Sequence, residues 1–555
     1  MANFPHNILT SLTVDNRFTI ESPALNFLQP ILDFLLNTHS TLYDSFLRNE
    51  MDGSTPRSHL LSPSANPGLA HSIYPSDPRI QSKYAVTYSD RSNYGIPGLI
   101  LLASNHPISQ MPSHLRKRVL TIGSTINGKP QNDSDWIDFF EKHLHGHILS
   151  FLERNIPVLR VFLNSVRVGY EQAFPIVVQI SLVLDPNLPI SFSQYEECAQ
   201  GLASYIDGEL STNWHGEEIH VEISGRPYPE PEIDTNPSPK DSLGYNPEFY
   251  RYQAPLPYTS IEVTGGTEGT LGCYIKHIEN GRIRIFALTC SHIVDRDTIF
   301  PYRYYPGSKI LEVQSPSLSE VCDTQSEVSR ILGPYYDEYF LDNYQATFNP
   351  WFGHIFATSG LQGHDWRLAG SEGASDWALI EVSESVSATF RNRHVPSSPQ
   401  FAPFDSPLVD AKINTATREQ ARIYFSSGPD FKSVKTETAF RPNGLVLKPK
   451  TRMNQESTWG EMNPIKSTII IPARGDCARS VGREWCCVGL GQEKGQRFCR
   501  AGDSGSVVLD QDFCPAGILW GSEVNMDITF VSPLPLIFRD VERKMGWAAG
   551  SVSLG

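Results

Sequence analysis

The chain has 555 residues, 41 of them proline, and a formal net charge of −15 at pH 7. Its 40% apolar content is ordinary for a globular protein, and its acidic charge argues against nonspecific nucleic-acid binding, because phosphate contacts need clustered Lys and Arg. At roughly 150 residues per domain, the length allows several domains. The prolines predict many turns, edge strands and at least one linker, so we expect extensive β structure and no nucleic-acid partner.

Residues 1–19 contain no basic segment followed by an apolar run, and no stretch approaches about 18 consecutive apolar residues. We therefore expect no secretion signal and no membrane partner, and an intracellular protein, cytoplasmic or nuclear. The nine cysteines are an odd number and are scattered, which fits reduced thiols in such a compartment. None shows the paired spacing of a structural zinc site, so we expect no metal and no cofactor.

Residues 1–225 are predicted to form an N-terminal α+β domain. Apolar residues recur at helical spacing over residues 22–49 and 134–155, whereas residues 51–93 are rich in Ser, Pro, Asn and Gly and predict a loop or disorder. Strand, strand, helix and strand patterns follow, which predict a small α/β layer with a helix packed on a sheet. No nucleotide-binding or metal motif accompanies them, so an interaction or regulatory role is the default. These four patterns lie at residues 158–163, 176–184, 193–206 and 219–223.

Residues 226–257 are dense in proline and are predicted to form an extended, semi-rigid linker. Residues 258–545 then form a second domain, and residues 546–555 a tail. Near its start, residues 270–275 and 282–288 alternate apolar and polar positions around Asn280-Gly281, which predicts a β-hairpin.

Two titratable residues stand at predicted strand ends in this second domain. His292 follows the second hairpin strand, where it can act as an acid or base, although one of 16 histidines is more often structural. Asp376 directly precedes an apolar run that starts at Trp377. A carboxylate at the mouth of a strand can be directed at an imidazole, or it can simply be a turn residue.

The stretch 500–508 reads Arg-Ala-Gly-Asp-Ser-Gly-Ser-Val-Val, with Ser504 between two glycines. A tight turn here presents one hydroxyl before a strand, which suits a nucleophile, and the N–H groups of Gly502 and Ser504 can stabilise an oxyanion. The alternative is an ordinary turn joining two strands. The order His292, Asp376, Ser504, all after the linker, favours the catalytic interpretation.

These residues resemble motifs of the chymotrypsin/trypsin-like serine peptidase family. Thr289-Cys290-Ser291-His292 is similar to the family's Thr-Ala-Ala-His, Asp376-Trp377-Ala378-Leu379-Ile380 to its Asp-x-Ala-Leu-x, and Gly502-Asp503-Ser504-Gly505 to its Gly-Asp-Ser-Gly. The layout further resembles intracellular trypsin-like proteins of filamentous fungi that carry an extra N-terminal domain. The resemblance covers residues 258–545, roughly half of the chain.

The resemblance implies an all-β C-terminal domain, a double antiparallel barrel of the trypsin-like type, beside the N-terminal α+β domain of a multi-domain chain. Ser504 would attack the scissile carbonyl, His292 would accept and return the proton, and Asp376 would orient His292. The N–H groups of Gly502 and Ser504 would form the oxyanion hole.

The resemblance also implies where a protein or peptide substrate binds. Trp520 and Gly521 fall on the strand that pairs with the substrate backbone. Phe498 falls at the base of the specificity pocket, where a phenylalanine argues against selection of Arg or Lys side chains.

Four departures from the family pattern accompany the motifs. Ser506 and Ser291 stand where the family has glycine and alanine, and the intervals between the three motifs require insertions. Secreted members pair the aspartate before the serine with an amine freed by cleavage. Asp503 is present, but no basic residue precedes an Ile-Val-Gly-Gly-like start, so Asp503 would need another cation or a hydrogen-bonded arrangement.

The sequence therefore predicts a serine endopeptidase that hydrolyses peptide bonds through a Ser-His-Asp triad and an acyl-enzyme intermediate, either active or latent. The alternative is a catalytically inert trypsin-like scaffold that acts as an interaction protein.

Overall fold

The structure of the chain is a computed structural model, and the predicted helix at residues 22–49, most of the predicted loop at 51–93 and most of the predicted linker at 226–257 lie outside the residues it describes. No helix in the described ranges is long and apolar enough to cross a membrane. The described residues are 83–86, 99–105, 117–126, 129–155, 160–169, 173–184, 192–227, 255–264, 268–294, 301–317, 320, 351–360, 376–394, 420–421, 424, 428–435, 440–449, 457–471, 480–492, 496–523 and 526–555.

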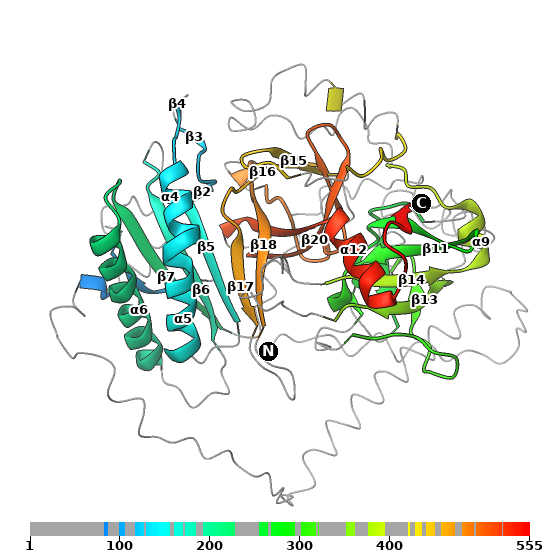
Figure 1. Cartoon of the computed structure of the whole chain (residues 1–555), viewed down its shortest axis with the longest axis horizontal. Helices are drawn as coiled ribbons and strands as arrows, with labels where there is room; N and C mark the ends of the chain where they lie inside the picture. The colour runs from blue at the N-terminus through cyan, green and yellow to red at the C-terminus, as the bar shows by residue number, and fades with distance from the viewer. Residues whose placement is uncertain are drawn as a thin grey trace, which may run out of the picture. The chain divides into compact units, whose positions relative to one another are not determined.

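The first layer of the described chain is a mixed sheet in the order β1, β7, β6, β5 (Figure 1). β6 and β7 are parallel and are connected by helix α6, whereas β1 with β7, β5 with β6 and β2 with β5 are antiparallel. The predicted order of strand, strand, helix and strand is confirmed. The bounds are β1 Ile100–Ser104, β2 Arg118–Leu120, β5 Arg160–Gly169, β6 Ile176–Leu184, α6 Phe192–Asn213 and β7 Ile219–Pro227, with a small hairpin of β3 Thr125–Ile126 and β4 Lys129–Pro130.

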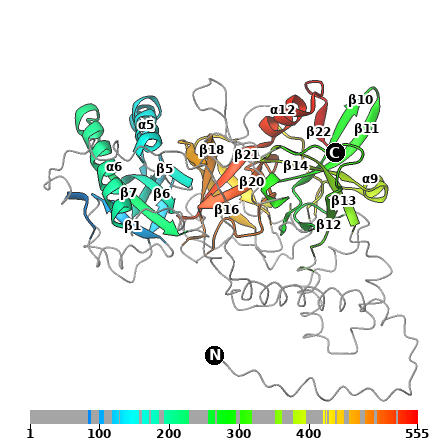
Figure 2. The same ribbon diagram turned by 90° about the horizontal axis from the view of Figure 1, so that it is seen from below.

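Helices α5 and α6 cover one face of this sheet (Figures 1 and 2). The predicted helix at 134–155 is present as three consecutive segments, α4 Ser134–Phe139, a π-helical turn η2 Phe140–Leu144 and α5 His145–Asn155. Its apolar side chains recur every three or four positions and are buried against the sheet, which is what the sequence pattern predicts. The buried positions are Trp136, Phe140, Leu144, Ile148, Leu149, Phe151 and Leu152.

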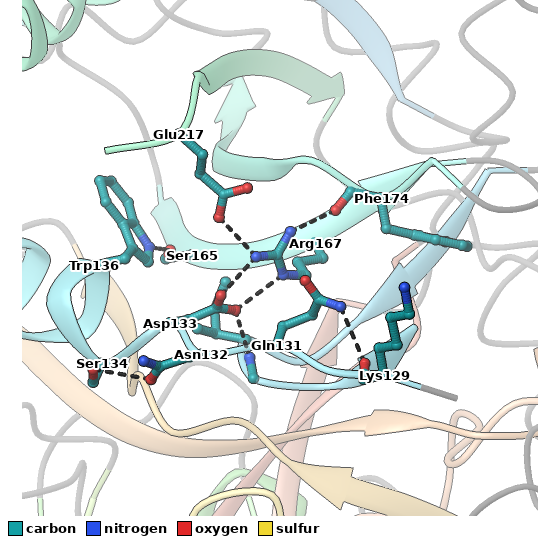
Figure 3. Close-up of polar contacts among 12 residues, drawn as sticks. Lys129, Gln131, Asn132, Asp133, Ser134, Trp136, Ser165, Arg167, Phe174 and Glu217 are labelled. Carbon is teal, nitrogen blue, oxygen red and sulfur yellow. Dashed lines mark hydrogen bonds and ion pairs between the residues drawn. The ribbon is translucent and has the colours of Figure 1, made fainter. Parts of the chain in front are cut away.

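A charge cluster around the buried Arg167 and Asp133 fixes the start of α4 to β5 (Figure 3). The Arg167 guanidinium donates to both carboxylate oxygens of Asp133, at 3.0 and 2.7 Å, and to Glu217 at 2.8 Å. A further N–H donates to the carbonyl oxygen of Phe174 at 2.7 Å. Asp133 is the residue before α4, so this two-point contact sets where the helix begins.

Strand β17 (Ser467–Ile471) joins this sheet to the second half of the chain. It pairs with β5 on one edge and with β18 on the other, both antiparallel. Phe162 of β5 stacks on Phe530 of β21, with ring centroids 5.6 Å apart. The predicted division of the chain near residues 226–257 stays a prediction, since the hydrogen-bonded sheet runs from the N-terminal half into the C-terminal half.

Six antiparallel strands of the C-terminal half close into a barrel. The pairs β15–β16, β16–β18, β18–β21, β21–β20, β20–β19 and β19–β15 complete the ring. Closure leaves no open edge around the barrel, whose interior is filled by apolar side chains. The bounds are β15 Leu445–Lys448, β16 Thr458–Met462, β18 Ser480–Gly489, β19 Val507–Asp510, β20 Pro515–Glu523 and β21 Ile528–Pro533.

A second antiparallel sheet runs in the order β22, β10, β11, β14, β13, β12, β8, β9. The predicted hairpin is confirmed as β10 with β11, and its turn residues Asn280 and Gly281 have φ values of 51° and 77°. Of the predicted double barrel, the described residues show one closed barrel. The second sheet does not close into another barrel there, because no pairing among the described residues joins β9 to β22. The bounds are β8 Ser260–Val263, β9 Glu268–Thr270, β10 Cys273–Glu279, β11 Arg282–Thr289, β12 Glu312–Gln314, β13 Trp351–Thr358, β14 Ala378–Val382 and β22 Val552–Leu554.

Short helical segments follow three of the strands named above. The 3-10 turn η4 (Ser291–Ile293) follows β11, α9 (Glu384–Thr389) follows β14, and α12 (Leu534–Met545) follows β21. α12 ends at Gly546, whose φ of 69° gives the left-handed C-cap that glycine adopts at low cost. The chain then returns through β22 to the edge of β10, so the predicted tail at residues 546–555 contributes a strand to the second sheet.

Candidate active site

His292 and Asp376 come together because their strands are neighbours. β11 pairs with β14, and the register places Thr289 opposite Ala378 at the ends of the two strands. His292 lies three residues past Thr289 in η4, and Asp376 lies two residues before Ala378. Strand pairing thus brings together two residues that are 84 positions apart in the sequence.

The Asp376 carboxylate contacts His292 at two points. One oxygen lies 2.6 Å from the ring Nδ1, and the other accepts the backbone N–H of His292 at 3.1 Å. The carboxylate is fully buried, whereas the His292 side chain is 26% exposed. Because an ionised carboxylate only accepts hydrogen bonds, Nδ1 carries the hydrogen in the neutral ring and Nε2 keeps its lone pair. Nε2 is the ring nitrogen that the Asp376 carboxylate does not contact.

The strand after Asp376 is itself anchored on both sides. The Trp377 N–H donates to the Ser359 hydroxyl at 2.8 Å, and the Ser359 N–H donates back to the Trp377 carbonyl at 2.8 Å. The indole Nε1–H of Trp377 donates to Asp540 of α12 at 2.8 Å. These bonds hold the Asp376 carboxylate in place against the His292 backbone.

Ser504 lies in a tight turn between the barrel strands β18 and β19. Gly502 and Gly505 have φ values of 89° and 98°, which L side chains rarely adopt. The Gly505 N–H donates to the Leu519 carbonyl of β20 at 2.8 Å, and the Ser504 carbonyl accepts the N–H of Thr270 in β9 at 2.9 Å. The turn is therefore held by both sheets at once.

The turn lies directly beside the end of β11. A Cβ added at Gly505 would come within 2.5 Å of the Thr289 hydroxyl and within 2.1 Å of the Thr270 carbonyl oxygen. The Cys290 thiol, two residues before His292, donates to the Leu519 carbonyl at 3.3 Å, the same oxygen that accepts from Gly505. Ser504 is thus brought next to the His292 segment through its backbone. No hydrogen bond between the Ser504 hydroxyl and the His292 ring is present among the described residues.

The two N–H groups expected to bind an oxyanion are available. In the turn, the N–H groups of Asp503, Gly505 and Ser506 all donate to carbonyl oxygens. Those of Gly502 and Ser504 donate to no acceptor within the described part of the chain. This pattern leaves two neighbouring donors on the residues that flank the Asp503 side chain.

The Asp503 side chain points inward and meets a lysine that the sequence interpretation missed. The Lys448 ammonium at the end of β15 lies 3.1 Å from an Asp503 carboxylate oxygen, and both side chains are fully buried. The same carboxylate oxygen accepts the N–H of Arg500 at 2.8 Å. The sequence did contain a signal for this lysine. The strand Leu445–Lys448 is apolar apart from its last residue, and a lysine is rarely fully buried unless it is paired.

The residues predicted to bind substrate are largely covered. The Phe498 side chain is buried, its N–H donates to Asp527 at 2.9 Å, and its carbonyl accepts the Thr458 hydroxyl at 2.8 Å. The indole Nε1–H of Trp520 donates to Glu484 at 3.2 Å. These positions fit a structural role as well as a pocket wall, so their part in substrate binding stays a prediction.

Gly521 lies beyond Trp520 on β20. It pairs with Phe530 of β21, and a Cβ added there would lie 3.5 Å from that ring. Its predicted contact with a substrate backbone likewise stays a prediction.

Asp527, beside Phe498, is a second residue that sequence reasoning missed. One of its carboxylate oxygens accepts the Phe498 N–H, and the other has no hydrogen-bond partner among the described residues. Burial raises its pKa to about 7, against the opposing effects of the Phe498 N–H and the Arg497 charge. The sequence gives no signal of this, because Asp527 sits in a turn where aspartate is common.

Cys290, His292 and Asp376 also lie close enough to share a metal ion, with their ligand atoms within 4.8 Å of one another. The chemistry of the set does not favour one. Burial raises the pKa of the Cys290 thiol, and metals bind the thiolate. Both Asp376 oxygens are already engaged by His292. The geometry suits proton transfer better than metal binding.

No family model and no curated protein matches this chain. Among solved structures, the chain has a distant structural likeness to the Rv3671c protease in its inactive form, at 12% identity and a TM-score of 0.23, covering 51% of this chain and 86% of that one. For the active form of the Rv3671c protease from M. tuberculosis the values are 12%, 0.22, 53% and 85%.

Proposed function

We propose that this chain is a serine hydrolase that cleaves peptide bonds with Ser504 as nucleophile and His292 as general base. The observation that carries the proposal is that the Asp376 carboxylate contacts His292 at two points, at 2.6 and 3.1 Å, beside the Ser504 turn. A purely structural histidine has no need of a buried carboxylate that fixes its tautomer while part of the ring stays exposed.

The first step forms a bond from the Ser504 oxygen to the substrate carbonyl carbon, while the hydroxyl proton moves to Nε2 of His292. The carbonyl oxygen becomes negative and is stabilised by the N–H groups of Gly502 and Ser504. Asp376 stabilises the cationic ring. The carbon–nitrogen bond then breaks, and His292 gives its proton to the leaving amine, which leaves an acyl-enzyme.

The second step repeats the first with water in place of the serine. His292 takes a proton from water as the oxygen bonds to the acyl carbon, and the bond to Ser504 then breaks as the proton returns to the serine oxygen. The carboxylic acid product leaves and the enzyme is restored. No group beyond the side chains and the two N–H donors takes part.

An edge of β20 supports a peptide as the substrate class. Within the described part of the chain, Gly521 and Ser522 pair with β21 on one side, whereas β19 pairs with the earlier part of β20, from Pro515 to Ile518. Backbone groups on the other edge can therefore hydrogen-bond an extended peptide, which is a common mode of peptide recognition.

Turnover of a peptide library by the full chain tests the proposal. We expect cleavage products from the wild-type protein and none from Ser504→Ala, with both proteins giving the same far-ultraviolet circular dichroism. If neither protein cleaves any peptide, and a partner binds both equally well, the chain is an interaction protein on a trypsin-like scaffold and the proposal fails.

A further inference from the structure

The pair Lys448 and Asp503 is a fully buried ion pair next to the proposed nucleophile. The nitrogen and oxygen lie 3.1 Å apart, and neither side chain is exposed. Among the described residues the ammonium has no hydrogen-bond partner, so the Asp503 carboxylate is its counter-charge. Lys448 therefore depends on Asp503 to offset the cost of removing its charge from water.

Burying this pair is a poor way to stabilise a fold. The cost of desolvating two charges roughly cancels their attraction, and well-packed apolar side chains often serve a barrel interior better. The two neighbouring residues of β15, Val446 and Leu447, are apolar and buried in the same barrel. Lys448, at the end of the same strand, instead places a buried charge beside the Ser504 turn.

What the pair can fix is the conformation of the turn. Asp503 lies between Gly502, with φ at 89°, and Ser504. Its carboxylate accepts the Arg500 N–H at 2.8 Å and its own N–H donates to the Arg500 carbonyl at 3.1 Å, so the side chain and the backbone of the turn form one unit. Drawing the carboxylate inward to Lys448 therefore sets the backbone on both sides of it.

The backbone that is set in this way carries the two available donors. The N–H groups of Gly502 and Ser504 flank Asp503 and donate to no acceptor within the described residues. If the carboxylate turned outward to solvent, the peptide units on either side would rotate with it. The donors would then lose the alignment that an oxyanion needs.

We propose that Lys448 is a positioning residue that keeps the N–H groups of Gly502 and Ser504 aligned for an oxyanion, so that the site forms without a chain end made by proteolysis. The inference rests on the proposed function and deepens it, because it assigns the regulation of the same site. The cation is a side chain of a barrel strand, so the aligned turn forms as soon as the barrel folds.

The chain offers a matched control in its N-terminal sheet. Lys117 and Glu222 form a second buried ion pair, 2.7 Å apart, with both side chains fully buried. Lys117→Met removes a buried lysine charge from beside a fully buried carboxylate, as Lys448→Met does. The control therefore separates a loss of stability from a loss of alignment.

The test uses the full chain with its intact mass confirmed, and compares wild type, Lys448→Met, Lys448→Met/Asp503→Asn and Lys117→Met. The double variant buries no unpaired charge, so it reports on alignment even where the single variant fails to fold. The readouts are kcat and KM for an activated ester, the affinity for phenylboronic acid, which forms a tetrahedral anion on a serine, and the thermal unfolding midpoint.

We expect the uncut wild-type protein to be active, and the double variant to lose about 100-fold in kcat, as when an oxyanion donor is removed, with KM little changed. Boronate affinity should fall in parallel with kcat. Lys117→Met should lower the unfolding midpoint and leave kcat and boronate affinity unchanged.

Two results overturn the inference while the proposed function stands. One is an active wild-type protein whose double Lys448 variant keeps full kcat and boronate affinity. The other is a wild-type protein that becomes active only after its chain is cut. A wild-type protein without activity before and after cutting would instead contradict the proposed function, and the inference would fall with it.

Discussion

The closed barrel and the second sheet contribute to the site in different ways. The second sheet supplies His292 and Asp376 from two paired strand ends, and the His292 ring is partly exposed. The barrel supplies the Ser504 turn, whose conformation is tied to a fully buried pair of charges. Under the proposed function, the sheet provides proton transfer at a ring that a substrate can reach, and the barrel provides alignment through a pair of charges that water does not reach. Changes in the sheet should therefore alter chemistry at constant stability, and changes in the barrel should alter both.

The largest expected effect comes from Asp376→Asn in the second sheet. We expect kcat to fall by about 10⁴, because an amide can donate to Nδ1 and favour the wrong tautomer of His292. The unfolding midpoint should change little, because the amide keeps an oxygen for the His292 N–H. Steady-state kinetics and thermal unfolding check this, with Asp540→Asn as the control that removes a nearby carboxylate. A loss of kcat in the control as large as in Asp376→Asn would show a merely structural role.

The next effect is a pH dependence in the barrel, at Asp527. Its pKa in the folded state is raised to about 7 by burial, above its ordinary value of 3.8. The folded state therefore holds a proton that the unfolded state releases, so stability falls as pH rises from about 4 to 7. Asp527→Asn should remove this slope and stabilise the protein at pH 8 on the order of 2 to 4 kcal/mol relative to wild type.

Urea unfolding of both proteins at pH 4 and pH 8 measures that difference. The other titratable groups are common to both proteins and cancel in the comparison. If the free energy of unfolding fell by the same amount from pH 4 to pH 8 in the wild type and in Asp527→Asn, the raised pKa of Asp527 would be contradicted.

A smaller effect is expected where the two sheets meet, at Gly505. Its φ of 98° and the 2.1 Å approach of an added Cβ to the Thr270 carbonyl oxygen leave no room for a side chain. Gly505→Ala should lower the free energy of unfolding by about 2 kcal/mol and displace Ser504. The labelling of Ser504 by a fluorophosphonate, a reagent that reacts with serine nucleophiles, should fall as a result. Gly281→Ala, at a hairpin turn with open space around it, is the control, and it should keep full labelling. Equal labelling of the two variants would show that the turn tolerates displacement.

The smallest effect is expected at the barrel surface. Lys435 pairs with Asp510 and Asp512 at 2.5 and 2.6 Å, and its side chain is 40% exposed. Lys435→Met should change the unfolding free energy by less than about 1 kcal/mol and leave kcat unaltered, because water screens exposed pairs. Urea unfolding at low and high salt checks this. A loss as large as that of Lys448→Met would erase the distinction between buried and exposed pairs in the barrel.

The sequence predicted those features that depend on local pattern. The 134–155 helix, the hairpin around Asn280-Gly281 and the strand ends that carry His292 and Asp376 follow from periodicity and turn residues. The flanking glycines predicted a tight turn at Ser504, and this turn is present.

Features that depend on which strands become neighbours could not be predicted. Lys448 looks like a polar strand end until β15 is placed against β19, which follows the Ser504 turn. The pairing of β17 with β5 likewise has no local signal, because it joins segments about 300 residues apart. The resemblance to a family predicted two closed barrels. One closed barrel is present, and the second sheet does not close within the described residues.

The account's central claim is that Ser504 is a nucleophile activated by His292 and Asp376. Labelling of the full chain with a fluorophosphonate, followed by peptide mass spectrometry to locate the adduct, tests it most directly. The account predicts one adduct, on Ser504, that is absent in Ser504→Ala and forms far more slowly in His292→Ala. An adduct on another residue, or labelling of Ser504 at the same rate without His292, would contradict it.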